Sequence, residues 1–405
     1  MAKPHIKDIL IEFKGDELTK YGLFPLVIWY LMDVINLPEY FQSLTVKSKR
    51  SGSKYKHSEN RKPKFDEVQM SMGLVVIMLL GISRLRKIND VLSTETKLAE
   101  LIGLPEFFDQ STAHNFLREF GKWHLDQLEK INDQLIQEFG FSSQQDILIL
   151  DLDSQTISQE SRKREQCVRG YNKKKPGKPC YQWNVAFAKG EAVTQVLRAG
   201  NTHGSTCFKE IVKETKQKLD KPISIVRVDG AYLSGNMIEF IFSEGLQVVT
   251  TEKYNWIIAQ ENVHINPQLW ENYDEDTRIY DLGYGRVLST TDQQLRAILV
   301  EKQQYPFPGK KKMPKILRYA IVENLTIRLA PFVLYEFYHQ RQTIENFFKE
   351  SGNSFNSGKM PSQKFKANQA YLLYLAIAYN CFVWFKKNFC HQNGKILPFN
   401  FSENE

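Results

Sequence analysis

One short apolar run constrains the fold of this chain more than any other feature. Residues 147–150 are Ile-Leu-Ile-Leu, and the run continues through Asp151 and Leu152 to Asp153. A continuous apolar run of this length predicts a strand that is buried on both faces, as in an α/β sheet. The two aspartates are two residues apart, so they lie on the same face of that strand. The run therefore predicts an α/β protein with carboxylates at the end of a buried strand.

The elements expected after this strand also fit an α/β sheet. Periodicity and turn residues predict strands at 183–188, 193–199, 223–228 and 247–250, with helices at 208–219 and 235–242. Asp229 directly follows the third of these strands. The carboxyl end of a strand in such a sheet is a common position for a functional acid. The alternative for each aspartate is a turn residue or a helix cap.

The rest of the chain has a different pattern on each side of this core. We predict four regions: a helical region at 1–145, an α/β region at 146–253, a β-rich region at 254–330, and C-terminal helices at 331–405. The β-rich region has short strands predicted at 278–280, 286–288, 295–300 and 317–322, and the last region has long helices predicted at 331–349 and 366–387.

Composition limits the class of protein. Of 405 residues, 42% are hydrophobic and 25% charged, which excludes a largely disordered chain and a polytopic membrane protein. The net charge of +8 favours a polyanionic partner such as nucleic acid. The five cysteines form no Cys-x-x-Cys pair, and no signal peptide is evident at the N-terminus. We therefore expect a cytoplasmic protein without structural disulfides or a zinc site.

The predicted helix at 331–349 carries a third acid. Tyr338, Arg341, Glu345 and Lys349 recur at spacings of three and four and form one polar stripe, with Glu345 at the edge of the apolar face. The alternative is a surface helix held by Arg341–Glu345 and Glu345–Lys349 ion pairs, each worth about 0.3–0.5 kcal/mol. That alternative explains the charges but not the two strand-end aspartates that precede them.

Taken together, these blocks resemble a known family. The chain resembles the DDE transposases of bacterial insertion sequences, in the branch whose catalytic Glu lies in a Tyr-x-x-Arg-x-x-x-Glu helix. The matching blocks are 148–154, 170–181, 198–201, 227–232 and 338–349. The resemblance implies a ribonuclease H-like catalytic core with a helical N-terminal domain and a β-rich insertion before the Glu helix. Residues 1–145 would then be the region that binds the DNA ends and dimerises, 146–253 the first part of the core, 254–330 the insertion, and 331–405 the helices that complete the core. Two positions depart from the family pattern: Gly352 stands where a Lys is common, and Ser-Arg-Lys-Arg fills 161–164.

The resemblance also implies a catalytic site. Asp153, Asp229 and Glu345 would be both the catalytic residues and the ligands of two Mg²⁺ ions, with Mn²⁺ able to substitute. Carboxylate oxygens suit these hard cations, and a pair of ions suits phosphoryl transfer. Asp151 remains an alternative to Asp153 as the first ligand.

Several basic and aromatic residues are candidates for contact with DNA. The expected contacts are Tyr338, Arg341, Lys349, Lys173, Lys174, Lys175 and Arg118. Solvated loops and an ordinary surface helix are the alternatives for the three lysines and for Arg118. Trp256 or Trp270 is a candidate for stacking on a flipped base, and a buried indole is the alternative for each.

The expected function is that of a DNA transposase. It would bind double-stranded DNA at the inverted-repeat ends of its element, pair two ends as a homodimer, and transfer the freed 3′-hydroxyl into target DNA. This would take place in the bacterial cytoplasm at the nucleoid, without a membrane. The alternatives are a stand-alone DNA nuclease on the same core and a non-catalytic DNA-binding regulator derived from a transposase.

Overall fold

The N-terminal third of the chain is helical. The computed structural model describes residues 19–22, 24–46, 64–82, 84–161, 163–173, 175–255, 257, 265–304, 315–353 and 357–390. The helices of this part are α1 (Phe24–Trp29), α2 (Leu37–Phe41), α3 (Glu67–Leu79), α4 (Ile88–Leu92), α5 (Thr96–Leu101), α6 (Gln110–Arg118) and α7 (Lys122–Phe139). Helix α3 begins with a capping box in which Asp66 accepts from the backbone N–H of Gln69. Most residues of α3 are buried, so it forms part of the core of the helical region.

A ten-stranded mixed sheet follows in the described part of the chain. Its strands are β1 (Leu148–Ser158), β2 (Val168–Arg169), β3 (Pro179–Ala188), β4 (Glu191–Ala199), β5 (Ile223–Val228), β6 (Gln247–Glu252), β7 (Glu271–Asn272), β8 (Thr277–Gly285), β9 (Leu295–Gln304) and β10 (Lys315–Glu323). The order in space is β2-β3-β1-β5-β6-β10-β9-β8-β7, and β4 also pairs with β3. β1 is therefore central in the sheet, as its apolar run predicts.

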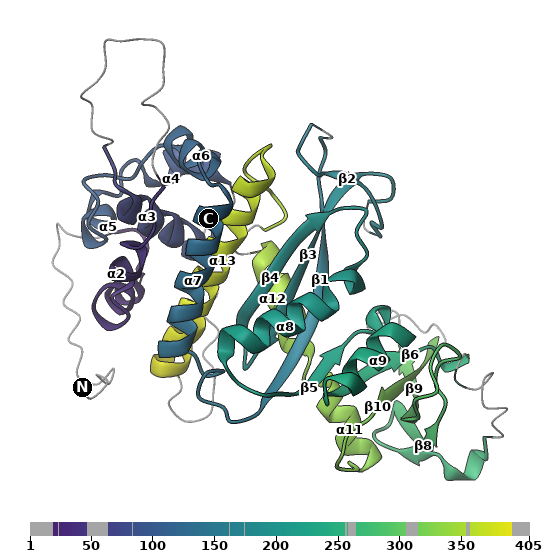
Figure 1. The fold of residues 1–405 in the computed structure, drawn as a ribbon. Helices are drawn as coiled ribbons and strands as arrows, with labels where there is room; N and C mark the ends of the chain where they lie inside the picture. Colours follow the sequence, from purple (N-terminus) through teal and green to yellow (C-terminus); the bar gives the residue numbers. More distant parts are fainter. Residues whose placement is uncertain are drawn as a thin grey trace.

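The first five long strands form a ribonuclease H-like sheet. β1 is antiparallel to β3 and parallel to β5, β3 is antiparallel to β4, and β5 is parallel to β6. The parallel pairs need crossovers, which α8 (Phe208–Leu219) and α9 (Gly235–Ser243) supply. Figure 1 shows these two helices beside the strands that they connect. The predicted α/β class with a ribonuclease H-like core is confirmed.

The β-rich stretch extends the same sheet. β10 pairs antiparallel with β6, and β9, β8 and β7 follow it outward. The strand predicted at 286–288 is wrong, because β8 ends at Gly285. Residues 286–288 are irregular and lead into a turn at 289–290, where the Arg286 side chain donates to the backbone carbonyls of Ser289 and Thr291.

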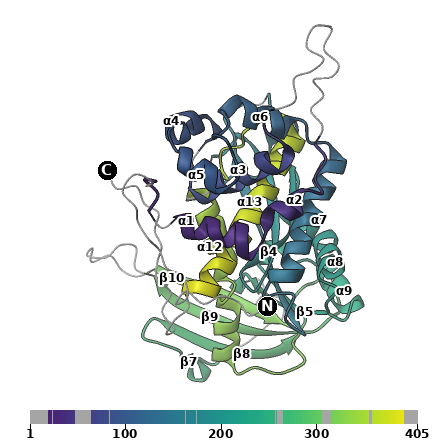
Figure 2. The ribbon, with the colours of Figure 1, turned by 90° about the vertical axis from the view of Figure 1, so that its left-hand side faces the viewer.

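Three helices complete the described fold: α11 (Pro331–His339), α12 (Gln342–Asn353) and α13 (Phe365–Phe385). The single helix predicted at 331–349 is wrong, because the chain turns at Gln340 and Arg341 between α11 and α12. Helix α13 is buried almost all round. It packs on α3, α7 and β4, and Figures 1 and 2 show it between the N-terminal helices and the sheet.

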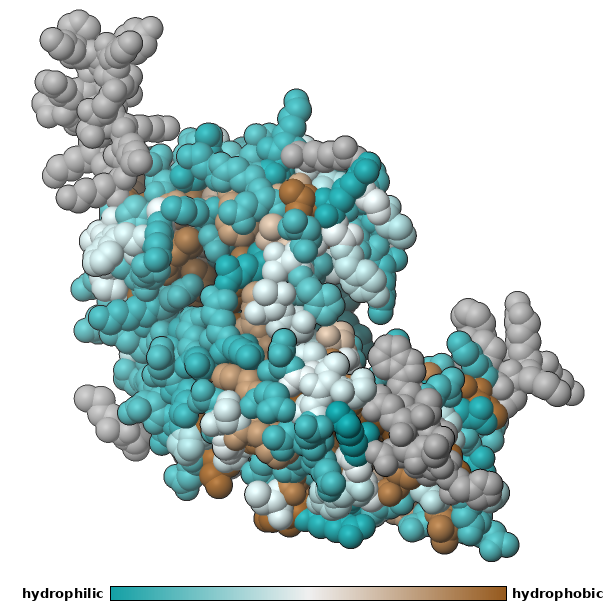
Figure 3. All heavy atoms as spheres, turned by 45° about the vertical axis from the view of Figure 1, so that its right-hand side comes forward, coloured by the Kyte–Doolittle hydropathy of each residue, from teal (hydrophilic) through white to brown (hydrophobic). Residues whose placement is uncertain are grey.

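The outer surface is largely polar. Hydrophilic residues cover most of the face drawn in Figure 3, with apolar residues scattered among them. Among the described residues, none of the helices has both the length and the apolar character that a membrane crossing requires. The division into four functional regions stays a prediction.

Candidate active site

The strand-end position predicted for Asp151 and Asp153 is wrong, because β1 continues to Ser158. The half-buried carboxylate of Asp153 lies in the middle of that strand. It accepts a hydrogen bond from the backbone N–H of Ser154 at 2.7 Å. Burial raises the pKa of Asp153, and the positive charge of Arg341 opposes that rise. The carboxylate thus depends on a nearby cation to stay ionised.

Arg341 supplies that cation and joins two of the predicted acids. Its Nη1 donates to Asp153 Oδ2 at 3.1 Å, and its Nη2 donates to Glu345 Oε1 at 3.0 Å. The guanidinium is buried, whereas the Glu345 side chain is 47% exposed. Burial opposes the charge on Arg341, but the negative charges of Asp153 and Glu345 outweigh it and raise the pKa of Arg341. The turn between α11 and α12 therefore directs Arg341 inward onto the sheet.

Asp229 lies next to Asp153 at the carboxyl end of the neighbouring strand. The parallel register pairs Leu152 with Val228, so the two aspartates follow paired positions. The Asp229 side chain is exposed and makes no hydrogen bond or ion pair with the described residues. Its charge nevertheless contributes to the raised pKa of Asp153. The structure therefore brings these two carboxylates into one electrostatic site.

Asp151 has a different environment from Asp153, although both side chains lie on one face of β1. Its two carboxylate oxygens accept from Nε and Nη2 of Arg227 at 2.7 and 2.8 Å, and both side chains are buried. Arg227 also donates to the backbone carbonyl of Phe337 at 2.6 Å. This ion pair joins β1, β5 and α11, so both oxygens of Asp151 are already engaged in the fold.

The other residues of the Tyr-Arg-Glu segment flank this group. Tyr338 is half-buried, and its ring centroid lies 6.0 Å from the Arg341 guanidinium. Burial raises the pKa of Tyr338. Lys349 is exposed on α12, and the Glu345–Lys349 ion pair is absent among the ion pairs of the described residues. Only the Arg341–Glu345 pair of the surface-helix alternative is present, and its arginine is buried.

The remaining candidates for DNA contact lie away from this group. Lys173 and Lys175 are exposed in the segment between β2 and β3; Lys173 lies over the Tyr171 ring, and Lys175 pairs with Glu160 at 2.7 Å. Arg118 is exposed at the end of α6. Lys174 and Trp256 lie outside the described residues.

Trp270 is described, and its environment fits packing. The indole is half-buried and packs on Tyr280 with ring centroids 5.6 Å apart. The guanidinium of Arg278 lies 4.8 Å from the indole centroid. Both contacts hold the indole against β8, which favours a structural role over stacking on a flipped base.

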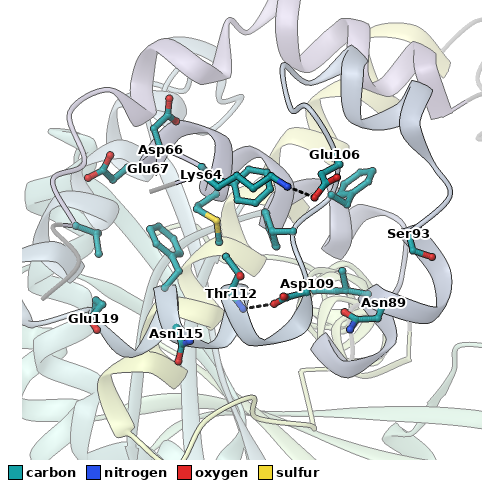
Figure 4. A pocket seen from close by; sticks show the side chains of 17 residues that line it. Lys64, Asp66, Glu67, Asn89, Ser93, Glu106, Asp109, Thr112, Asn115 and Glu119 are labelled. Carbon is teal, nitrogen blue, oxygen red and sulfur yellow. Dashed lines mark hydrogen bonds and ion pairs between the residues drawn. The ribbon is translucent and has the colours of Figure 1, made fainter. Parts of the chain in front are cut away.

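A separate pocket of about 610 Å³ lies among the N-terminal helices (Figure 4). Several acids line it, and the view shows Asp109 accepting from Thr112 and Lys64 paired with Glu106. Asp153 and its neighbours do not line this pocket. Its acidic lining does not suit a polyanion.

Comparison with protein families assigns the chain. The family model described as transposase DDE domain group 1 matches residues 5–396. The chain belongs to this DDE transposase family. A comparison with curated proteins finds no match.

Among the solved structures that this DDE transposase resembles are three complexes of Mos1. The Mos1 strand transfer complex has 14% identity and a TM-score of 0.18, covering 48% of this chain and 60% of that one. A pre-cleavage Mos1 transpososome has 14% identity and a TM-score of 0.17, covering 49% and 63%. The Mos1 transposase paired-end complex with the left transposon end has 14% identity and a TM-score of 0.18, covering 57% and 78%. The matched part is thus less than two thirds of the first two Mos1 chains.

The family implies divalent metal ions, and the donor chemistry of the site fits them. Asp153, Asp229 and Glu345 offer carboxylate oxygens, which Mg²⁺ and Mn²⁺ prefer. The exposed Asp229 carboxylate has no partner among the described residues. No group of three His, Cys, Asp or Glu in the described part of the chain is gathered closely enough to hold an ion. Arg341 holds Asp153 and Glu345 instead, so a metal site would require these side chains to rearrange.

Sequence reasoning missed Arg227, the partner of Asp151. The available signal was a charged residue between Val226 and Val228 within an apolar strand. A charge in such a strand needs a buried counter-charge, and the neighbouring parallel strand carries Asp151 at the paired position. Pairing of β1 with β5 was required to identify it.

Proposed function

We propose that this chain is a DNA transposase that cuts the ends of its element and joins the freed 3′-hydroxyl to target DNA. The observation that carries the proposal is the link through Arg341 between Asp153 on β1 and Glu345 on α12, beside Asp229. Asp153 and Arg341 are 188 residues apart in the chain, so the fold gathers these groups from separate segments. Membership of the DDE transposase family supports the same activity.

In this proposal Asp153, Asp229 and Glu345 hold two Mg²⁺ ions, and Mn²⁺ substitutes. When bound, the ions activate the attacking oxygen and stabilise the leaving oxygen of the phosphodiester. Asp153 is the first ligand rather than Asp151, because both oxygens of Asp151 already bind Arg227. Without metal, Arg341 provides the positive charge that the half-buried Asp153 carboxylate requires.

The substrate in this proposal is double-stranded DNA, at the inverted-repeat ends and at the target. Tyr338 and Arg341 lie at the carboxylates and would meet the DNA beside the cut phosphate, with Lys349 on the exposed face of α12. Lys173, Lys175 and Arg118 are exposed and would contact the backbone farther away, as would Lys174. Two copies of the chain would pair two ends as a homodimer, at the nucleoid of a bacterial cell.

The deciding experiment is a strand-transfer assay on a short DNA element whose two ends carry the inverted repeats that flank the coding region. Joined product in Mg²⁺, absent in EDTA, is expected. Cleavage without joining would instead indicate a nuclease. Binding of the ends without cleavage, in a protein that retains its fold, would indicate a DNA-binding regulator.

A further inference from the structure

A basic groove lies between the N-terminal helices and the far end of β1. Two hollows form it, of about 750 and about 520 Å³, and helix α6 lines both of them. One wall is α6 with the turn before α4. The opposite wall is made by residues 158–161, 164–166, 175, 358–361 and 364–366, in which Arg164 of the first hollow directly precedes Glu165 of the second. We call it the α6 groove, and its eight cations are Arg84, Arg86, Arg118, Arg164, Lys175, Lys359, Lys364 and Lys366.

Most of these cations have no counter-charge among the described residues. Six are exposed, and their side chains make no hydrogen bond or ion pair with the described part of the chain: Arg84, Arg86, Arg118, Lys359, Lys364 and Lys366. The three acids that line the groove are Glu119, Glu160 and Glu165. Glu160 already pairs with Lys175 and Lys178, and Glu165 accepts from the backbone N–H of Phe365. The groove thus has a surplus of positive charge.

The positive charge of the groove affects the pKa of a neighbouring histidine. His114 lies on the groove wall of α6, one turn before Arg118. Burial lowers the pKa of His114, and the charge of Arg118 lowers it further. Like charges gathered in one hollow repel each other, and a bound polyanion removes that repulsion.

We infer that the α6 groove binds the phosphate backbone of double-stranded DNA. The two aromatic residues that line its basic inner part, Phe120 and Phe365, are buried. Their rings are therefore not available as stacking platforms for unpaired bases, which single-strand sites use. The polar face of α6 presents Gln110, Ser111 and His114 to the same space, side chains of the kind that contact DNA from a helix. A duplex fits this surface better than a single strand.

Strand β1 connects the α6 groove with the candidate active site. Asp153 and Ser158 lie on β1, and Ser158 lines the groove. Five residues of a strand span about 17 Å, which corresponds to about five base pairs of B-form DNA. The inference rests on the proposed function in this respect: the same duplex would lie at the carboxylates and in the groove.

The test measures binding of a generic 30-base-pair duplex to the full chain by fluorescence anisotropy over a salt series, without metal. The groove variant is Lys364→Ala with Lys366→Ala, which removes two exposed cations. The matched control is Lys216→Ala with Lys221→Ala, two lysines without ion pairs to the described residues, at and just after the end of α8 and outside the groove. Circular dichroism melts confirm that each variant is folded. A second groove variant, Arg118→Ala, repeats the test from the opposite wall.

We expect the Lys364/Lys366 variant to bind the duplex more weakly, with the slope of log K against log salt reduced by about two. For Arg118→Ala the slope should fall by about one. The control keeps the wild-type slope. Unchanged slopes in both folded groove variants, while the wild type binds, would overturn the groove and leave the transposase proposal standing. A wild type that does not bind duplex DNA at all would overturn the transposase proposal itself. Equal losses in groove and control variants would show diffuse charge rather than a groove.

Discussion

Nη1 of Arg341 lies 3.1 Å from Oδ2 of Asp153, and the same guanidinium contacts Glu345. The buried guanidinium and the half-buried carboxylate stabilise each other's charged forms. The arrangement places a cation between two of the three acids that we propose as metal ligands. It also makes Arg341 a competitor for any ion that these acids bind.

The first prediction concerns the three acids. Asp153→Asn, Asp229→Asn and Glu345→Gln should each abolish cleavage, because each change removes a carboxylate ligand while keeping the side-chain shape. Binding of the element-end DNA should stay near the wild-type level, since none of the changes removes a phosphate contact. Gel-shift and cleavage assays on the same preparations measure both properties. A cleaving Asp229→Asn variant would remove that residue from the site.

The second prediction separates Asp151 from Asp153 by stability. Asp151→Asn leaves the buried Arg227 without its counter-charge and should cost about 3–5 kcal/mol of unfolding free energy. Asp229→Asn is the matched control, because that carboxylate is exposed and has no partner among the described residues. Urea denaturation followed by circular dichroism measures both.

A double variant of the Asp151–Arg227 ion pair provides a further comparison. Replacing both members of the pair, Asp151→Leu with Arg227→Met, should recover most of the lost stability, because no buried charge remains. An Asp151→Asn variant that is as stable as the wild type but cannot cleave would instead make Asp151 the metal ligand.

The third prediction concerns Arg341 as a competing cation. In the DNA-free chain, Arg341→Ala should bind Mn²⁺ several-fold more tightly than the wild type, because the guanidinium no longer occupies Asp153 and Glu345. Titration calorimetry measures the affinity without any reaction. Lys349→Ala is the control, since Lys349 is exposed on α12 and forms no ion pair with the described residues. Weaker Mn²⁺ binding in Arg341→Ala would mean that the guanidinium positions the acids for the ion.

The fourth prediction concerns pH and the α7–α8 contact. Burial raises the pKa of Asp133 on α7 to about 6, against the opposing charge of Lys218 on α8. The unfolded chain has the ordinary value near 3.9, so it binds fewer protons than the folded chain between about pH 4 and 6. The stabilising contribution of protonated Asp133 is therefore complete below about pH 4 and is lost as pH rises through about 6. The loss amounts to at most about 3 kcal/mol.

Urea denaturation between pH 4 and 7 tests this. Asp133→Asn should reduce the fall in stability across that window, whereas Asp126→Asn, an exposed site on the same helix, should leave it unchanged. Identical pH profiles for the wild type and the Asp133 variant would exclude this carboxyl as the cause.

Local pattern predicted much of the core. The apolar run before Asp153 predicts a buried strand from local sequence alone, because a continuous apolar run is typical of a strand that is buried on both faces. The helix at 208–219 and the strand at 223–228 match α8 and β5, because helical periodicity and a short apolar run are both local properties of the sequence. Asp229 follows β5 directly, so its strand-end position was also readable.

Contacts between distant segments decided the rest. The spacing of Tyr338, Arg341 and Glu345 predicted one helix, but the structure has a turn at Arg341, whose side chain reaches Asp153. Local periodicity does not contain that ion pair. The different environments of Asp151 and Asp153 likewise depend on the register of β1 with β5, which puts Arg227 beside Asp151. The sequence determined which strands and acids exist; tertiary pairing decided which acid is neutralised within the fold, because a buried charge takes its properties from the nearest opposite charge.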